Sequence, residues 1–135
     1  MTEDDLKKRT KAFALRVLKL VAALPKTIAG RTIGNQLARL GTSVAANYRA
    51  ACRARSKVEF VSKLGIVEEE ADESALWLEL IIEGELMNRT LVEPLWNEAN
   101  ELVAIMTSSR KSASRSIASL PRRSRATIAN QNSKI

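Results

Sequence analysis

The sequence predicts an all-α protein, an antiparallel up-down-up-down four-helix bundle followed by a disordered basic C-terminal tail. Apolar residues recur at helical spacing through most of the chain, and no stretch shows the strict alternation of a half-buried strand. Only three Pro and five Gly occur in 135 residues, and the connections between periodic stretches are short. Amphipathic helices with short connections pack as antiparallel neighbours. We place the bundle at residues 1–113 and the Ser/Arg-rich tail at residues 114–135.

The first two helices are bounded by capping and breaking signals. The first begins after Thr2, a suitable N-cap followed by three acids, and stops at Pro25, whereas the second spans roughly residues 31–53. Gly34 and Gly41 each cost about 1 kcal/mol relative to Ala inside a helix, so we expect them to admit the close approach of a neighbour. The expected core stripes are Leu6, Phe13, Val17, Leu20 and Leu24, and then Ile33, Leu37, Leu40, Val44 and Tyr48.

The last two helices are delimited in the same way. Ser56 and Glu59 form a capping-box pattern, in which the hydroxyl and the carboxylate each satisfy an end amide, and the third helix ends near Asn88. The fourth begins around Val92, tolerates Pro94 in its first turn and frays between residues 109 and 113. The expected core stripes are Phe60, Leu64, Val67, Ala71, Ser74, Leu78 and Ile81, and then Leu95, Ala99, Leu102 and Met106.

Charge divides the chain into three blocks. Residues 1–63 hold 14 bases and 4 acids, residues 64–106 hold 1 base and 11 acids, and residues 107–135 hold 7 bases and no acid. A basic first helix pair and an acidic second pair suit a head-to-tail contact that closes into a ring. The alternative is that this segregation only pairs the helices correctly inside a monomer. The last block, with eight Ser and no aromatic residue, predicts a tail that either grips phosphates or only aids solubility.

Composition excludes several kinds of chemistry. The chain has no His, which removes His-based acid–base catalysis and the commonest transition-metal ligand. Its one cysteine, Cys52, forms neither an internal disulfide nor a Cys-rich zinc site, and we expect an inert thiol. Neither the P-loop pattern nor GxGxxG occurs. The sequence therefore predicts no enzyme, no cofactor and no metal site.

The beginning of the chain does not resemble a targeting or membrane segment. It is acidic where a secretory signal is basic, and the apolar window at residues 12–24 is interrupted by Arg16 and Lys19. This window also falls short of the ~20 apolar residues that span a bilayer. We therefore expect a cytoplasmic protein with no membrane partner.

Four blocks occur in a family-specific order: Gln36-Leu37-Ala38-Arg39, Ser43-Val44-Ala45-Ala46-Asn47, Ser56-Lys57-Val58-Glu59-Phe60, and the stretch from Glu70 to Leu80. With these blocks, residues 6–112 resemble the four-helix-bundle proteins known as 23S rRNA intervening-sequence proteins. That name describes a genomic location rather than an activity. The resemblance implies a homopentameric ring of up-down-up-down bundles. The family usually has an acidic Glu-Gly pair after its Asn, where this chain has Arg49-Ala50-Ala51-Cys52-Arg53, a more basic surface.

Two sets of side chains are candidate binding residues. The polar set would contact phosphates and read unpaired bases, or else Ser43 and Asn47 bond the helix connection and Glu59 is only a cap. The basic set would form a phosphate-binding rim, repeated in an oligomer, or else a solvated charged turn. The polar set is Gln36, Arg39, Ser43, Asn47, Glu59 and Lys63, and the basic set is Arg49, Arg53, Arg55 and Lys57 together with Arg39.

These observations predict a non-enzymatic, ring-forming bundle that binds structured RNA through its first two helices and its tail. The alternative is a protein-interaction scaffold that presents a repeated surface to another protein and has no nucleic-acid role. We expect Trp77 and Trp96 to be packing residues. The acidic cluster, expected to be solvated or inter-subunit rather than metal-binding, is Glu68, Glu69, Glu70, Asp72 and Glu73.

Overall fold

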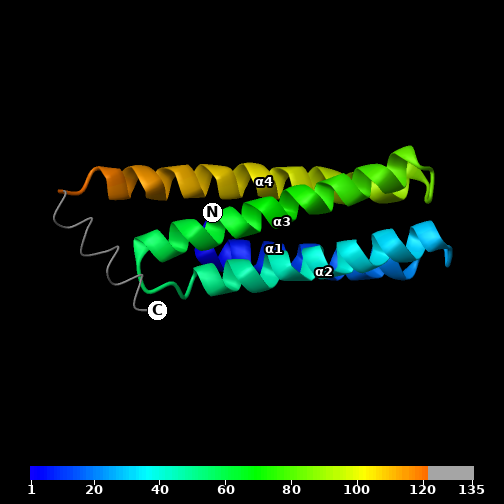
Figure 1. Cartoon of the computed structure of the whole chain (residues 1–135), viewed down its shortest axis with the longest axis horizontal. Coiled ribbons are helices and arrows are strands. Elements are labelled where there is room, and N and C mark those ends of the chain that lie inside the picture. Colours follow the sequence, from blue (N-terminus) through cyan, green and yellow to red (C-terminus); the bar gives the residue numbers. More distant parts are fainter. Residues whose placement is uncertain (122–135) are drawn as a thin grey trace.

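Four long helices make up the bundle. The computed structural model describes residues 1–121, and its helices are α1 (Glu3–Ala22), α2 (Ile28–Ala51), α3 (Lys57–Glu83) and α4 (Arg89–Ala118). They run alternately up and down, with each helix packed on the next in the chain (Figure 1). Helix α1 also lies against α4, so the four helices surround one core. The predicted all-α up-down-up-down bundle is confirmed.

Side-chain caps fix the first turn of every helix. The Thr2 hydroxyl accepts a hydrogen bond from the backbone N–H of Asp5, whose carboxylate accepts one from the N–H of Thr2. This pair is a complete capping box. Thr27, Ser56 and Asn88 cap α2, α3 and α4 in turn. The predicted end of the third helix near Asn88 is therefore too late, because Asn88 is the cap of the helix that follows.

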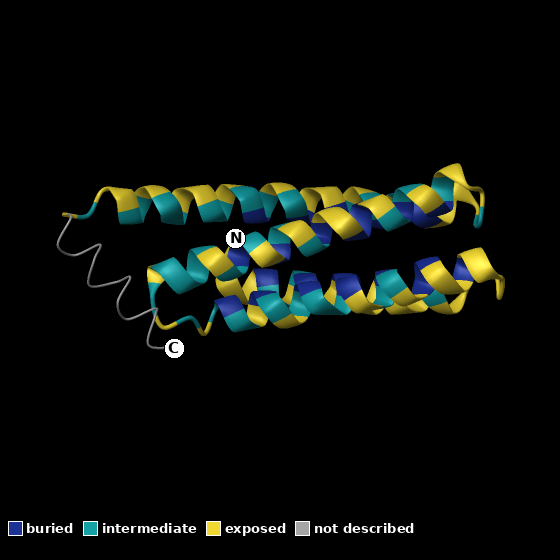
Figure 2. Ribbon diagram, in the orientation of Figure 1, coloured by how far each residue is buried: buried dark blue, intermediate teal, exposed yellow. Residues whose placement is uncertain are grey.

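The predicted apolar stripes form the core, and the buried residues line the inner faces of the helices (Figure 2). Every stripe residue is buried except Phe60, which is half-buried. Burial of one such side chain contributes about 1.5–3 kcal/mol. Two polar residues are also buried, Thr10 and Ser74. Each donates its hydroxyl proton to the backbone carbonyl one helical turn earlier, at 2.8 Å, so neither is left unpaired.

Helices α1 and α2 approach closely at two of the glycines of α2, Gly34 and Gly41. A methyl group at Gly41 would stand 2.8 Å from a methyl carbon of Val17, and one at Gly34 would stand 3.2 Å from Val21. Both glycines are buried. The predicted use of these glycines for close approach is confirmed, and α1 is the neighbour that they admit.

The fourth helix is longer than predicted. It continues to Ala118, because no Gly or Pro interrupts the chain between Pro94 and Pro121 and Ile117 remains partly covered. The Lys57 ammonium donates a hydrogen bond to the Ser116 hydroxyl at 2.8 Å, which ties the extension to the start of α3. Helix α4 thus extends past the boundary predicted at residue 113. The rest of the predicted tail, residues 122–135, lies outside the described residues.

Candidate nucleic-acid interface

The polar residues predicted on the second helix make several different contacts. The Arg39 guanidinium donates to the side-chain oxygen of Gln36 at 2.9 Å on the exposed surface. The Asn47 amide donates to the Glu70 carboxylate at 2.7 Å and so links α2 to α3. Asn47 is therefore held by the neighbouring helix rather than by the connection between the two helices. Ser43, on the same polar stripe, is half-buried.

The predicted residues at the α2–α3 connection shape the turn. The backbone N–H of Glu59 donates to the Ser56 hydroxyl at 3.1 Å, and the Glu59 carboxylate accepts from the backbone N–H of Arg55 at 3.1 Å. The Lys63 ammonium lies 3.9 Å from the same carboxylate. The capping role considered for Glu59 is confirmed, although its carboxylate satisfies the amide of Arg55 rather than that of Ser56.

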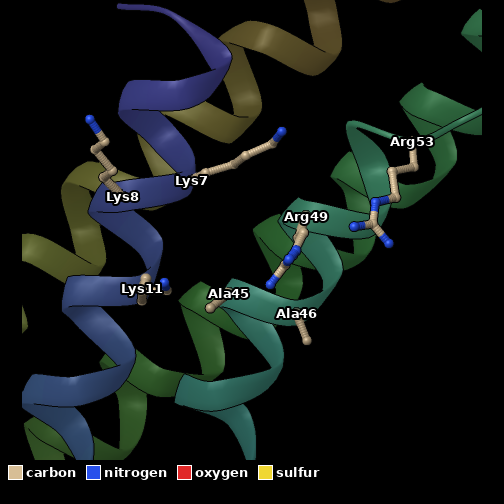
Figure 3. A pocket seen from close by; sticks show the side chains of 7 residues that line it. All are labelled: Lys7, Lys8, Lys11, Ala45, Ala46, Arg49 and Arg53. Carbon is tan, nitrogen blue, oxygen red and sulfur yellow. The ribbon is translucent and has the colours of Figure 1, made fainter.

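A basic hollow of about 370 Å³ lies between the start of α1 and the end of α2. Two alanines from α2 contribute short side chains, which leave room between the long cationic ones (Figure 3). Lys7 extends from α1 toward α2, and both arginines project from α2 (Figure 3). The residues that line the basic hollow are Lys7, Lys8, Lys11, Ala45, Ala46, Arg49 and Arg53.

The positive charge of the basic hollow is largely uncompensated. Five cations line it and no acid does. Within residues 1–121, Lys7 alone among these five cations forms an ion pair, at 3.9 Å from Asp4. Helix α2 contributes no acidic residue along its whole length. Like charges gathered in a concave site raise the local potential and attract anions.

Other arginines of the bundle, unlike most cations of the basic hollow, form ion pairs with acids of neighbouring helices. Arg9, on the same helix as the lysines, donates hydrogen bonds to Glu98 on α4 at 2.7 and 2.8 Å. Arg110 donates to Glu68 at 2.6 Å across the α3–α4 seam. These arginines hold helices together, whereas the cations of the basic hollow remain available to an external anion.

Sequence reasoning found the α2 half of the basic hollow and missed the α1 half. Arg49 and Arg53 belong to the predicted basic set, but Arg39, Arg55 and Lys57 do not line the hollow. The three lysines of α1 were not predicted. A signal for them exists, because Lys7 and Lys11 are one turn apart, and antiparallel pairing places the start of α1 beside the end of α2.

The acidic cluster of α3 is divided by its contacts. Glu68 accepts hydrogen bonds from Arg110 and from the Thr107 hydroxyl, and these lower the pKa of Glu68 below its ordinary value. Glu70 accepts from Asn47, and the remaining three acids are exposed or outward-facing. In the part of the chain that the structure describes, no group of three or more His, Cys, Asp or Glu is placed to hold a metal ion.

The cysteine and the tryptophans occupy partly buried positions. Burial raises the pKa of the Cys52 thiol above its ordinary value, an effect larger than the lowering by its hydrogen bond with Tyr48. The thiol is therefore protonated at neutral pH, when it is a poor nucleophile. Trp77 and Trp96 pack against the core, and the Trp96 indole N–H donates to Glu79 at 3.1 Å. The predicted packing role of the tryptophans fits these contacts.

The length and apolar content of the helices bear on membrane insertion. None of those formed by residues 1–121 is long and apolar enough to cross a bilayer.

The fold and the basic hollow together define a class of small, basic, all-α bundle proteins with an anion-attracting surface between the first two helices. Within that class, the chain belongs to the 23S rRNA-intervening sequence protein family, whose family model matches residues 3–108. The match spans α1 to α3 and most of α4, and it confirms the resemblance drawn from the sequence blocks. The end of α4 and the basic tail lie beyond it.

A solved structure shows the same architecture. It is the crystal structure of a protein with unknown function from the S23 ribosomal protein family of Bacteroides thetaiotaomicron, with 32% sequence identity to this chain and a TM-score of 0.74. The match covers 82% of this chain and 99% of that chain. None of the curated proteins matches this chain. Family and fold are thereby established, and the function has to be argued from the surface.

Proposed function

We propose that this protein is a non-enzymatic, oligomeric helical bundle that binds structured RNA through the basic hollow. The single observation that carries the proposal is the cluster of five cations around two alanines, with no lining acid. Nucleic-acid affinity depends chiefly on contacts between Lys or Arg and phosphates, which release condensed counterions. A concave cluster of this kind matches that chemistry better than any other surface of the bundle.

The composition of the basic hollow favours recognition of the RNA backbone. Arg49 and Arg53 can each hold two phosphate oxygens with a planar guanidinium, whereas the three lysines act as compact charges. The short side chains of Ala45 and Ala46 would let a phosphodiester approach the helix surface. No aromatic side chain lines the hollow, so base stacking contributes nothing there. Shape and phosphate spacing of a folded RNA would then decide affinity.

The polar stripe and the tail are secondary contributors in this proposal. Arg39 and Gln36 form an exposed pair that can add a phosphate contact beside the hollow. Apart from Arg110, which pairs with Glu68, the six bases of residues 107–135 would add affinity without sequence preference. The resemblance to pentameric family members further supports an oligomer, in which five basic hollows would bind one RNA with avidity.

A non-enzymatic role is supported by the chemistry of the chain. The sequence has no His, and its single thiol is kept protonated by burial. An RNA-binding protein needs neither cofactor nor metal, and we propose none.

The second candidate is a protein-interaction scaffold. The observation that favours it is the exposure of large apolar side chains along α1 and α3, among them Leu15 at 62% and Leu76 at 49%. Large apolar side chains gathered on the outward face of a helix are typical of an interaction site. A protein partner would be bound mainly through apolar contacts. Raised salt would therefore weaken the affinity for this partner much less than it weakens RNA binding.

The proposed function is tested with a fluorescein-labelled RNA hairpin that contains an internal bulge, in a fluorescence anisotropy titration. The double variant Arg49→Ala/Arg53→Ala removes two lining cations and should weaken binding by about tenfold or more. The matched control, Lys26→Ala/Arg31→Ala, removes the same charge from exposed sites near the start of α2, away from the hollow, and should change the affinity by less than about threefold. Equal losses in the two variants would show that only net charge matters and would reject the hollow as the site.

A further inference from the structure

The basic hollow gathers more positive charge than a passing nucleic-acid strand balances. Five cations line a volume of about 370 Å³, which as a sphere is about 9 Å across. Without Lys7, which pairs with Asp4, four of these five cations remain for a ligand. One strand of a duplex carries one negative charge per about 3.4 Å of helix axis, so a stretch of about 9 Å contributes only two or three charges. A ligand with denser negative charge matches the hollow better.

The positive charge of the hollow ends abruptly along α1 in both directions. One turn before Lys7 stand the exposed acids Glu3 and Asp4, and one turn after Lys11 stands Leu15, which is 62% exposed. A strand that continued through the hollow along α1 would meet carboxylates at one end and an apolar side chain at the other. Neither of these binds phosphate, so the hollow is better suited to the end of a chain than to its middle.

Helix α2 provides one polar path out of the hollow. Residues at intervals of three or four share one stripe of this helix, which consists of Arg53, Arg49, Ala46, Thr42 and Arg39. Arg39 lies about 10 Å beyond Ala46 along the helix axis. It is exposed, and its guanidinium donates to an uncharged amide rather than to an acid. An RNA that ends in the hollow can therefore leave along this stripe, with Arg39 on its backbone.

The lining of the hollow suits phosphate oxygens rather than a base. The guanidiniums of Arg49 and Arg53 can each hold two oxygens, and the ammonium groups of the three lysines lie around the same hollow (Figure 3). Among the described residues, no aromatic side chain lines it, so a base gains no stacking there. A free nucleotide would be held by its phosphates alone, whereas an RNA gains further contacts along α2. This difference favours a phosphate group carried by RNA.

We infer that the basic hollow binds the 5′-terminal triphosphate of an RNA. A triphosphate has one ionised oxygen on each inner phosphate and about two on the last, as in a phosphate monoester. Its charge therefore balances the four cations that remain for a ligand, and it does so within one short group. This inference rests on the proposed function and names the part of the RNA that the site recognises.

Three versions of the bulged hairpin test the inference in anisotropy titrations of the full chain at about 0.15 M salt. One carries a 5′-triphosphate and one a 5′-hydroxyl. The third carries a 5′-hydroxyl on four additional unpaired nucleotides, which restore the negative charge without the terminal group. The triphosphate hairpin should bind at least about tenfold more tightly than either of the others. Equal affinities of the triphosphate hairpin and the extended hairpin would overturn the inference, because added charge alone would then explain the binding.

Protein variants locate the preference for the triphosphate. Lys8→Ala/Lys11→Ala removes two lining cations and should reduce the preference to less than about threefold. The matched control Lys26→Ala/Arg31→Ala removes the same charge from exposed sites outside the hollow and should keep the full preference. Circular dichroism checks that both variants are helical. A full preference in Lys8→Ala/Lys11→Ala would place the triphosphate elsewhere and overturn the inference.

Inorganic tripolyphosphate distinguishes the end of an RNA from a free polyphosphate. It should displace the triphosphate hairpin only at concentrations at least about tenfold above the Kd of that hairpin, because it makes no contact along α2. Displacement at a concentration equal to that Kd would overturn the assignment to RNA and leave a free polyphosphate as the ligand.

Failure of this inference is separable from failure of the proposed function. If the triphosphate and hydroxyl hairpins bind equally and Arg49→Ala/Arg53→Ala still weakens both, only the inference is overturned. If none of the hairpins binds, both are overturned.

Discussion

Arg9 on α1 and Glu98 on α4 form a two-pronged ion pair across the seam between the first and last helices. The guanidinium donates from Nε and from one terminal nitrogen to the two carboxylate oxygens, at 2.8 and 2.7 Å. The side chains are 28% and 15% exposed, so the pair is partly shielded from water. These hydrogen bonds lower the pKa of Glu98 below its ordinary value. The pair closes the ring of helices where the chain itself provides no connection.

Removal of this pair should loosen the α1–α4 seam. Arg9→Ala leaves the Glu98 carboxylate partly buried without its main partner, and we expect a loss of about 1–3 kcal/mol in the free energy of unfolding. Lys8→Ala is the control, because Lys8 is an exposed neighbour that makes no ion pair within residues 1–121. Urea unfolding followed by circular dichroism measures both. Equal stabilities of the two variants would show that the pair contributes nothing.

Stability should also fall in acid. The pKa values of Glu98 and Glu68 are lowered in the folded state by hydrogen bonds from Arg9 and Arg110. A group with a depressed folded pKa contributes stability above its unfolded pKa, near 4.3, and this contribution is lost as pH falls through the folded value. The stability gap between wild type and Glu98→Gln should therefore be full at pH 7 and shrink below about pH 4. A gap that stays constant down to pH 2 would contradict this linkage.

Two glycines should respond oppositely to the same substitution. At Gly41, an added methyl meets three carbons of Val17 at 2.8–3.0 Å, so Gly41→Ala should cost about 1–3 kcal/mol through overpacking. At Gly65, the nearest atom is a carbon of Arg110 at 3.7 Å, an ordinary contact. Gly65→Ala should therefore stabilise α3 by about 0.5–1 kcal/mol through helix propensity. Thermal unfolding measures the stability of both variants relative to wild type. A stabilised Gly41→Ala would refute the close approach of α1 and α2.

The thiol of Cys52 should react slowly in the folded protein. Its raised pKa and partial burial both reduce the amount of accessible thiolate at pH 7.5. We expect an aromatic disulfide reagent to modify it at least about tenfold more slowly than in the urea-unfolded chain. Equal rates in the two states would mean that the arginines near Cys52 activate the thiol despite its burial.

The sequence was sufficient for the architecture because the core signal is local and repeated. The stripe from Leu6 to Leu24 needs only the helical period, and each cap is recognised from a few neighbouring residues. Helix boundaries are harder to predict, since the Ser- and Arg-rich sequence that is typical of a tail continues α4 to Ala118. The charged and Ser-rich composition of this segment argues against a helix. The absence of Gly and Pro and the hydrogen bond between Lys57 and Ser116 nevertheless keep the end of α4 helical.

The candidate site was only half predictable because it depends on pairing between helices. Arg49 and Arg53 were found from local charge, yet residues that looked equivalent, such as Asn47 and Glu59, make contacts within the bundle. Which cations remain without an acid is decided by the neighbouring helix, and Arg9 and Lys8 differ in this way although adjacent. A sequence pattern does not contain that distinction until the helices are placed side by side.

The most direct test of RNA binding by the bundle is the salt dependence of affinity for the bulged hairpin, measured by anisotropy. The full chain is compared with a chain that ends at Pro121 and so keeps all four helices. We expect the shorter chain still to bind, with a slope of log Kd against log salt steeper than about 2. In Arg49→Ala/Arg53→Ala this slope should fall by about 1–2. Binding by the full chain alone, with the same weak affinity for any RNA, would contradict it. That outcome would assign the RNA affinity to the tail and would favour binding of a protein partner as the function of the bundle.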